Sequence, residues 1–171
     1  MLNPSMAQLI NDQYHREIFS AHQYLAMCSY FLDHDLDGFA NFFRVQAEEE
    51  FMHASKQFDY LHEVGGRITY GAVDAPRNEF GSILDVFEAA LEHERFITRH
   101  IHEIVKASLE QSDFATHQFM QWFVREQVEE EANMRTLIAK LRMISDNQSA
   151  LYLLNEELKQ RKAEAAGADP S

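Results

Sequence analysis

Apolar residues recur at alternating steps of three and four along four long stretches of the chain. This spacing places them on one face of an α-helix, so each stretch predicts an amphipathic helix. Ser5 is the candidate N-cap of the first helix, and Gly65-Gly66 follows the second as a helix C-cap would. The predicted helices cover about residues 5–32, 38–64, 82–110 and 114–144.

The connections between these stretches differ in length. Short polar turns at residues 33–38 and 111–113 join the first helix to the second and the third to the fourth, so each pair is expected to be antiparallel. Residues 66–80 contain Gly and Pro76 but no sustained helical period. A connection of that length can cross a bundle from end to end, which predicts a long crossover between the second and third helices.

The C-terminal part continues the helical pattern only briefly. After a break at residues 145–148, a short amphipathic segment extends from Ala150 to about Lys162. Residues 163–171 are small and polar and are expected to form a disordered tail. The pattern therefore predicts one all-α domain over residues 1–162, a four-helix bundle with a short fifth C-terminal helix.

The composition is that of a single helical domain. The 171 residues include six Gly and three Pro, too few for a protein rich in hairpins. The formal net charge of −13 argues against nucleic-acid or anionic-membrane partners and is compatible with cations as ligands. Cys28 is the only cysteine, which excludes an internal disulfide. Because there is neither a signal peptide nor an apolar run long enough to span a bilayer, a cytoplasmic location is expected.

Each of the four apolar stripes is interrupted by acidic or amide side chains. In the second stripe the interruption is Glu50 and His53, which lie three residues apart and therefore share one helix face. A carboxylate and an imidazole at this spacing can bind one metal ion. The interrupting residues are Glu17 in the first helix, Glu50 and His53 in the second, Glu94 in the third, and Gln127 and Glu130 in the fourth.

These side chains are predicted to lie at one level of the bundle. The acids are 15 to 18 residues from the turns of their hairpins, which corresponds to about 22 to 27 Å at the α-helical rise. Burying a carboxylate without a partner costs several kcal/mol, so four that face each other require neutralisation. Two divalent cations would balance the four charges. Oxygen-rich ligands with a single imidazole suit Fe(II) or Mn(II) better than a structural zinc ion.

Four segments around these acids carry a family resemblance. They are Glu17 with Tyr24, Glu49-Glu50-Phe51-Met52-His53, His93-Glu94, and residues 118–130 with the sequence QFMQWFVREQVEE. With these segments the chain resembles bacterial non-haem ferritins, and the resemblance extends over nearly its whole length, down to the segment at residues 151–158. It implies a ferritin-like four-helix bundle and an iron centre inside each subunit.

The resemblance also implies roles for individual residues. Glu50 bridges two irons, and a third iron position lies on the cavity side. Tyr24, one heptad after Glu17, hydrogen-bonds the site or supplies an additional electron. The implied ligands are Glu17, Glu50 and His53 for the first iron; Glu50, Glu94 and Glu130, with Gln127 nearby, for the second; and Glu49, Glu126 and Glu129 for the third.

Two departures from related families refine this assignment. Di-iron oxygenases and bacterioferritins carry a second Glu-x-x-His, and here the corresponding place is occupied by Gln127 and Glu130. The second iron would thus be bound without an imidazole, which suits an enzyme that releases its ferric product. Bacterioferritins place a haem-binding Met directly after the second-helix Glu, whereas Phe51 stands there in this chain. We therefore predict that the protein binds no haem.

The function implied is iron storage. Fe(II) would be oxidised by O2 or H2O2 at the di-iron centre, and ferric mineral would be deposited inside a hollow shell of twenty-four subunits, with the fifth segment lining a symmetry axis. Glu110, Asp113 and His117 are candidates for an entry pore and equally for solvated turn residues. One alternative is a di-iron redox enzyme, peroxidase-like, without mineral storage. Another is a DNA-protecting mini-cage protein, against which the acidic charge argues.

Overall fold

The computed structural model describes residues 2–163, and all the regular secondary structure of this part of the chain is helical. None of the described helices is both long and apolar enough to cross a membrane. The predicted tail at residues 163–171 lies, apart from Ala163, outside the described residues. The five helices are α1 (Pro4–Asp33), α2 (Asp37–Glu63), α3 (Ile83–Glu110), α4 (Phe114–Ile144) and α5 (Gln148–Leu158).

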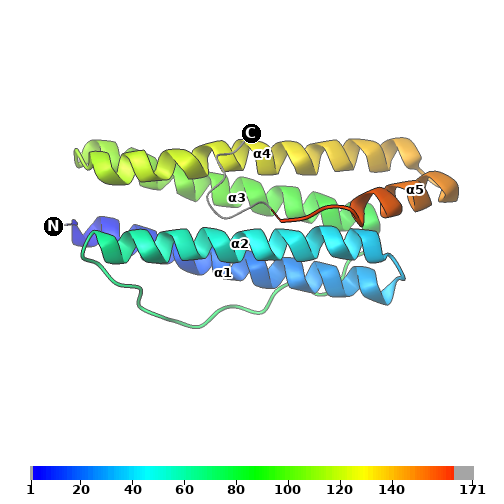
Figure 1. Cartoon of the computed structure of the whole chain (residues 1–171), viewed down its shortest axis with the longest axis horizontal. Coiled ribbons are helices and arrows are strands. Elements are labelled where there is room, and N and C mark those ends of the chain that lie inside the picture. The colour runs from blue at the N-terminus through cyan, green and yellow to red at the C-terminus, as the bar shows by residue number, and fades with distance from the viewer. Residues whose placement is uncertain (1, 164–171) are drawn as a thin grey trace.

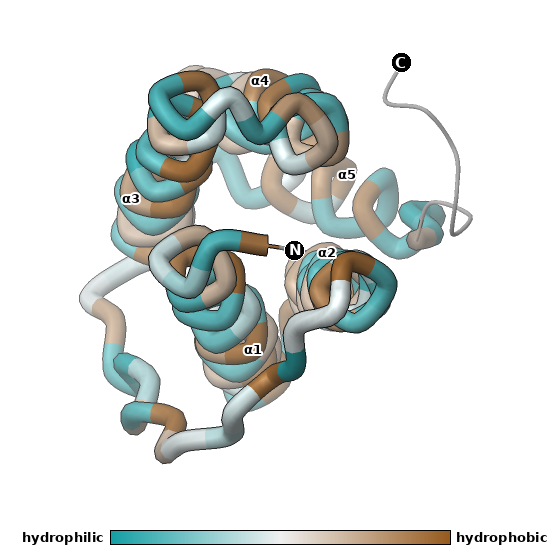
Figure 2. The backbone as a smooth tube through the Cα atoms, turned by 90° about the vertical axis from the view of Figure 1, so that its left-hand side faces the viewer, coloured by the Kyte–Doolittle hydropathy of each residue, from teal (hydrophilic) through white to brown (hydrophobic). Residues whose placement is uncertain are grey.

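The four long helices form a bundle of two antiparallel hairpins, α1 with α2 and α3 with α4, so the predicted fold class is confirmed (Figure 1). The long connection from α2 to α3 runs along the outer side of α1 (Figures 1 and 2). It is attached to that helix at two levels. The Thr69 amide donates to Asn11 Oδ1 at 2.7 Å, and Gln23 exchanges two hydrogen bonds of 2.8 and 2.9 Å with the backbone of Arg77. The crossover therefore spans the bundle, as its length predicts.

The helix ends differ from the sequence-based expectation in two places. The N-cap of α1 is Asn3, whose side chain accepts a hydrogen bond from the Ser5 amide, so the assignment of Ser5 as the cap is wrong. Both residue types can cap a helix, and Pro4 at the first helical position favours Asn3. Helix α5 ends at Leu158 rather than near Lys162, because the chain leaves its helical path to lie against α2.

The first turn of α2 is capped by a residue of α5. Its own N-cap position, Leu36, offers no side-chain hydrogen bond. Instead, Asn155 Oδ1 accepts hydrogen bonds from the amides of Gly38 and Phe39 at 2.8 and 3.2 Å, and its Nδ2 donates to Asp37 Oδ1 at 3.0 Å. A Cβ atom on Gly38 would lie 1.7 Å from the Asn155 carbonyl oxygen. Only glycine therefore allows α5 to dock here.

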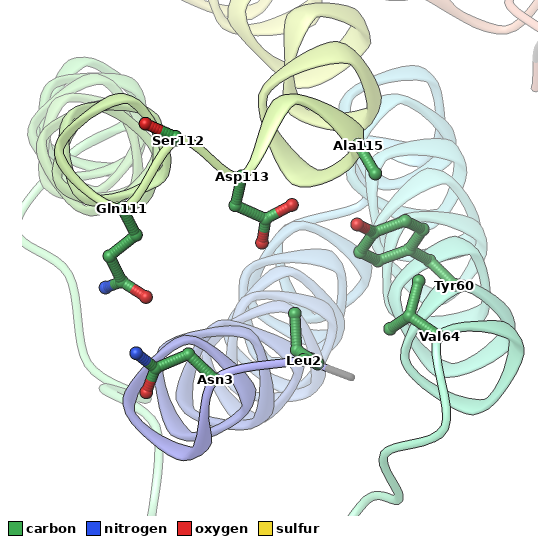
Figure 3. Close-up of a pocket in the computed structure, with 8 residues that line it drawn as sticks. All are labelled: Leu2, Asn3, Tyr60, Val64, Gln111, Ser112, Asp113 and Ala115. Atoms are coloured by element: carbon green, nitrogen blue, oxygen red, sulfur yellow. The ribbon is translucent and has the colours of Figure 1, made fainter.

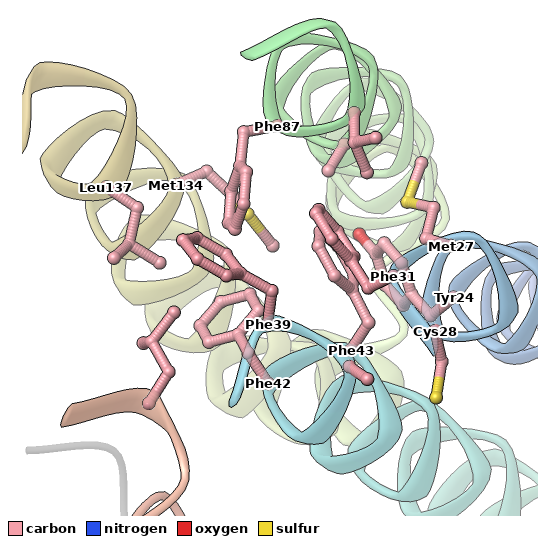
Figure 4. Close-up of a cluster of buried hydrophobic side chains, with 14 of the residues drawn as sticks. Tyr24, Met27, Cys28, Phe31, Phe39, Phe42, Phe43, Phe87, Met134 and Leu137 are labelled. Carbon is pink, nitrogen blue, oxygen red and sulfur yellow. The ribbon is translucent and has the colours of Figure 1, made fainter. Parts of the chain in front are cut away.

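The interior consists of two apolar clusters with a polar layer between them. The cluster nearer α5 is rich in aromatic rings, among them Phe31, Phe39, Phe43 and Phe87, which face one another across α1, α2 and α3 (Figure 4). The other cluster, at the opposite end of the bundle, contains the first turns of α1 and the last turns of α2. The buried polar side chains that separate them include all the acids that interrupt the predicted stripes: Glu17, Glu50, Glu94 and Glu130.

Candidate metal centre

Glu17 from α1 meets Glu50 and His53 from α2 in the polar layer. Each of these side chains is about 99% buried, with 1% relative exposure, and their ligand atoms all lie within 4.8 Å of one another. Within residues 2–163 no other three Asp, Glu, His or Cys side chains converge in this way. The Nδ1 atom of His53 is 3.2 Å from Glu50 Oε2, as the one-turn spacing predicts. These three residues can bind one metal ion together.

Two glutamines hold one oxygen of Glu17 and leave the other open. Gln13 and Gln57 donate from their Nε2 atoms to Glu17 Oε1 at 2.9 and 3.0 Å. Glu17 Oε2 and His53 Nε2 are buried and have no hydrogen-bond partner. Buried polar atoms without a partner are rare and costly in folded proteins. A buried carboxylate oxygen without a hydrogen-bond partner, converging with a second carboxylate and an imidazole, fits a hard or borderline divalent cation such as Fe(II).

The acids contributed by α3 and α4 also accept hydrogen bonds from neutral side chains, and in Glu94 both carboxylate oxygens are bonded. Tyr24 donates its hydroxyl proton to Glu94 Oε1, and Gln127 Nε2 lies 3.0 Å from Glu94 Oε2. Gln46 Nε2 donates to Glu130 Oε2 at 2.8 Å. Tyr24 and Gln127, both predicted near the site, thus contact its α3 acid directly.

Burial governs the electrostatics of this layer. Desolvation raises the pKa of Glu50, Glu94 and Glu130. For Glu130, desolvation and repulsion from Glu94 together raise the pKa to about 7. Desolvation also raises the pKa of Tyr24, followed by repulsion from Glu94, so its hydroxyl remains a donor at neutral pH. For His53, desolvation lowers the pKa, but Glu50 and Glu126 outweigh it and the pKa is raised. Protons therefore balance part of the negative charge when no cation is bound, and cation binding would release them.

The three acids assigned to a third iron position do not form a converging group like that of Glu17, Glu50 and His53 among residues 2–163. Glu126 Oε1 is 3.7 Å from His53 Nε2, while its buried Oε2 has no partner. Glu49 is 5% exposed, and its Oε2 forms an ion pair with Arg161 Nη2 at 2.8 Å. Glu129 is half-buried on α4. The structure thus places Glu126 beside the main site and Glu49 against a cation of its own chain.

Aromatic side chains surround the centre. Trp122 and Phe123 approach His53 edge-on, with ring centroids 5.4 and 5.9 Å from the imidazole. His93, directly before Glu94 in α3, packs against Tyr24, its Nε2 lies 2.7 Å from Ser20 Oγ, and burial lowers its pKa to about 4. Phe51, at the haem-ligand position of bacterioferritins, is half-exposed.

Several residues that support the centre were not predicted as site residues. Three are glutamines located one helical turn from a predicted ligand on the same face, which is a signal that the sequence does contain. Arg161 is distant in sequence and gives no such signal. The residues are Gln13, four before Glu17; Gln46, four before Glu50; Gln57, four after His53; and Arg161.

A pocket of about 470 Å³ lies away from the acids, at the end of the bundle where α1 begins and α3 turns into α4 (Figure 3). Asp113 points into it, but both of its carboxylate oxygens accept hydrogen bonds from Thr116, at 3.1 and 2.6 Å. The carboxylate of Asp113 is thus the N-cap of α4, a structural role that the sequence analysis did not assign to it.

An antiparallel four-helix bundle with a long crossover and inward-facing Glu and His ligands defines the class of carboxylate-rich metal proteins to which ferritins belong. Residues 7–144 match the family model described as "Ferritin-like domain". The chain belongs to the ferritin family, and its buried Glu17, Glu50 and His53 fit an iron-storage member of that family.

Curated relatives and solved structures agree with this placement. The chain is 40% identical over 158 residues to the bacterial non-heme ferritin of Staphylococcus aureus (strain MRSA252), covering 92% of this chain and 95% of the relative. It is 39% identical over 161 residues to that of Staphylococcus saprophyticus, covering 94% and 96%. An open-pore ferritin from the archaeon Archaeoglobus fulgidus superposes with a TM-score of 0.93 at 45% identity, covering 95% of this chain and 100% of that one. An engineered closed form of the Archaeoglobus fulgidus ferritin gives 0.94 at 44%, covering 96% and 100%.

Proposed function

We propose that this protein oxidises Fe(II) at the buried centre and stores the ferric product inside a closed shell built from twenty-four copies of the chain. The observation that carries the proposal is the convergence of Glu17, Glu50 and His53, with a buried Glu17 oxygen that has no hydrogen-bond partner, in a chain of the ferritin family. Fe(II) is the substrate, and O2 or H2O2 is the oxidant.

In the proposed reaction, Glu17, Glu50 and His53 bind the first Fe(II), and Glu50 reaches from it toward a second ion between Glu94 and Glu130. Each Fe(II) gives up one electron, and H2O2 takes the two electrons with two protons to give two water molecules; with O2 the product is H2O2. In the empty centre, protons neutralise part of the charge on the carboxylates. These protons leave as the ions bind, so the carboxylates are ionised when they coordinate the metal.

The second ion requires a rearrangement of hydrogen bonds. Glu94 must exchange the bonds from Tyr24 and Gln127 for a bond to metal. Tyr24 then stays within reach of Glu94 and of the ion that Glu94 binds, where its hydroxyl can orient the carboxylate or supply an electron. A third cation position is proposed at Glu49, Glu126 and Glu129, because Glu126 carries a buried oxygen without a partner next to His53.

Exposed apolar side chains at one end of the molecule support assembly into a shell. Met143 at the end of α4 and Tyr152 and Leu153 on α5 are 86%, 63% and 67% exposed in the single chain. Burying such side chains against other copies would be favourable by about 25 cal/mol for each Å² of apolar area removed from water. Symmetric closed assemblies of one chain are the usual outcome of such contacts.

Aerobic addition of Fe(II) to the apo-protein tests the proposal, with ferric absorbance and soluble iron per subunit followed over time. We expect a fast phase that saturates near about two or three irons per subunit, and uptake that then continues far beyond that number. Glu50→Ala should abolish the fast phase, whereas Glu48→Ala, on the exposed side of the same helix, should preserve it. Uptake that stops at about two irons per subunit would contradict storage and favour a di-iron redox enzyme.

A further inference from the structure

The chain that follows α5 turns back and lies over α2, as the red segment between α2 and α4 in Figure 1 shows. Asn41 on α2 holds this segment in place. Its Nδ2 atom is 3.0, 3.4 and 3.1 Å from the carbonyl oxygens of Leu158, Lys159 and Arg161. Together with the contact between Asn155 and Gly38, these bonds fix where the side chain of Arg161 can reach.

The guanidinium of Arg161 lies in a partly enclosed position beside the metal centre. Its Nη2 is 2.8 Å from Glu49 Oε2, its Nη1 donates to the Phe42 carbonyl at 3.4 Å, and its carbon is 4.3 Å from the centroid of the Phe42 ring. The Arg161 side chain is 21% exposed, and that of Glu49 is 6% exposed. An ion pair with so little solvent, held by stacking and by a backbone carbonyl, is stronger than an ordinary surface pair.

This positive charge occupies the region to which the proposed function assigns a third cation. Glu49 directly precedes Glu50 in α2, and Glu126, across the seam between α2 and α4, has a buried oxygen without a partner. Arginine does not lose its proton in proteins, so its charge can leave Glu49 only if the side chain moves away. A metal ion and the guanidinium therefore compete for the same carboxylate.

We propose that the guanidinium of Arg161, held near α2 by the Asn41 hydrogen bonds, competes with the third cation for the carboxylate of Glu49. It neutralises Glu49 while no ion is bound there, it must swing into solvent when an ion takes Glu49, and its return favours release of that ion toward the store. The inference rests on the proposed function, which places a cation at Glu49, Glu126 and Glu129. It gives the C-terminal segment a role in setting how tightly the third position binds.

Calorimetric titration of Zn²⁺, a cation without redox chemistry, into the assembled apo-protein tests this role. Arg161→Gln should tighten the third binding step by about tenfold, the effect of removing about 1.4 kcal/mol of competition, and leave the two tighter steps nearly unchanged. Lys162→Gln removes the same formal charge from the neighbouring exposed residue and should change no step. In a Glu49→Gln background, Arg161→Gln should add nothing, because the two side chains act as a pair.

Arg161→Lys separates competition by charge from a purely structural role, because lysine keeps the charge but loses the stacking on Phe42. We expect the lysine variant to resemble the unmodified protein. The inference is overturned if the lysine variant behaves like the glutamine variant, if Arg161→Gln leaves the third step unchanged or weakens it, or if only two ions bind in either protein. If the unmodified protein bound no Zn²⁺ and also showed no fast phase of Fe(II) oxidation, the result would instead contradict the proposed function.

Discussion

The two halves of the metal centre differ in how they are held before any cation binds. On the α1–α2 side, the ligand atoms of Glu17, Glu50 and His53 lie within 4.8 Å of one another, and Glu17 Oε2 has no hydrogen-bond partner. On the α3–α4 side, Glu94 and Glu130 accept hydrogen bonds from neutral side chains. One half is preorganised for a cation, and the other must give up existing bonds first. The difference predicts that the two ions bind in order, the first to α1 and α2.

This asymmetry follows from the choice of side chain at two positions of α4. A second Glu-x-x-His would place a carboxylate at position 127 and an imidazole at position 130. Here Glu130 stands in place of the imidazole, and the Gln127 amide donates to Glu94 at 3.0 Å. An amide donor stabilises the empty carboxylate and competes with a metal ion for it. A second ion bound without an imidazole should therefore be held less tightly, which suits the release of product in the proposed function.

The largest expected effect comes from removing the imidazole from the preorganised half. His53→Ala should weaken the first Zn²⁺ binding step by about a hundredfold, since it removes one of three converging ligands. Calorimetry on the assembled apo-protein measures it. His62→Ala, an exposed histidine on the same helix, is the matched control and should bind normally. Equal weakening of the first and second steps would show that the two halves do not fill in order.

The pH dependence of the free energy of unfolding tests the protonation state of Glu130, on the α3–α4 side of the centre. Desolvation and repulsion from Glu94 raise the pKa of Glu130 to about 7, so the folded apo-protein keeps a proton that the unfolded chain has lost. The free energy of unfolding should therefore fall as the pH rises from about 4.5 to about 7, by up to about 3 kcal/mol. Urea unfolding of the apo-protein at both ends of this range measures the change.

Glu130→Gln should make that part of the pH dependence less steep, because an amide does not titrate, while Glu50 and Glu94, whose pKa values are also raised, keep their contribution. Glu103→Gln, on the exposed face of α3, should leave it as it is. Saturating Zn²⁺ should also reverse the trend, because bound cations take the place of the protons. A Glu130→Gln profile parallel to that of the unmodified protein would count against a proton on this carboxyl group.

A smaller effect is expected from removing one of the hydrogen bonds that Glu94 accepts on the α3–α4 side of the centre. Tyr24→Phe removes the hydroxyl that donates to Glu94, so the second ion has one bond fewer to displace. The second Zn²⁺ step should tighten by about fivefold, the equivalent of about 1 kcal/mol for a neutral hydrogen bond. Tyr30→Phe, farther along α1, controls for loss of a hydroxyl. An unchanged second step would mean that the bond from Tyr24 persists when the metal binds.

The sequence predicts the bundle and the ligand layer because both depend on local periodicity. Steps of three and four place Glu17, Glu50, Glu94 and Glu130 on inward faces, and the helical rise then sets a common height. The supporting glutamines are also placed by helical periodicity, since Gln13 lies one turn from Glu17 on the same face.

What the sequence does not predict depends on contacts between distant segments. The path of the chain after α5 is set by Asn41, whose amide meets carbonyl groups 117 to 120 residues away in the sequence. Only that path explains why α5 ends at Leu158 and why Glu49 has an arginine partner. Similarly, the choice of Asn3 over Ser5 as the α1 cap lies within the one- or two-residue range over which helix ends vary.

The cap that α5 supplies to α2 has a consequence for the order of events during synthesis. A ribosome makes Gly38 long before Asn155, so the helix that carries Glu50 and His53 leaves the exit tunnel with its first amides unpaired. Chains grow by roughly 5 to 20 residues per second, which leaves a delay of several seconds. Only a nearly finished chain can complete this helix. Shorter, newly made fragments therefore lack the hydrogen bonds that cap the helix carrying Glu50 and His53.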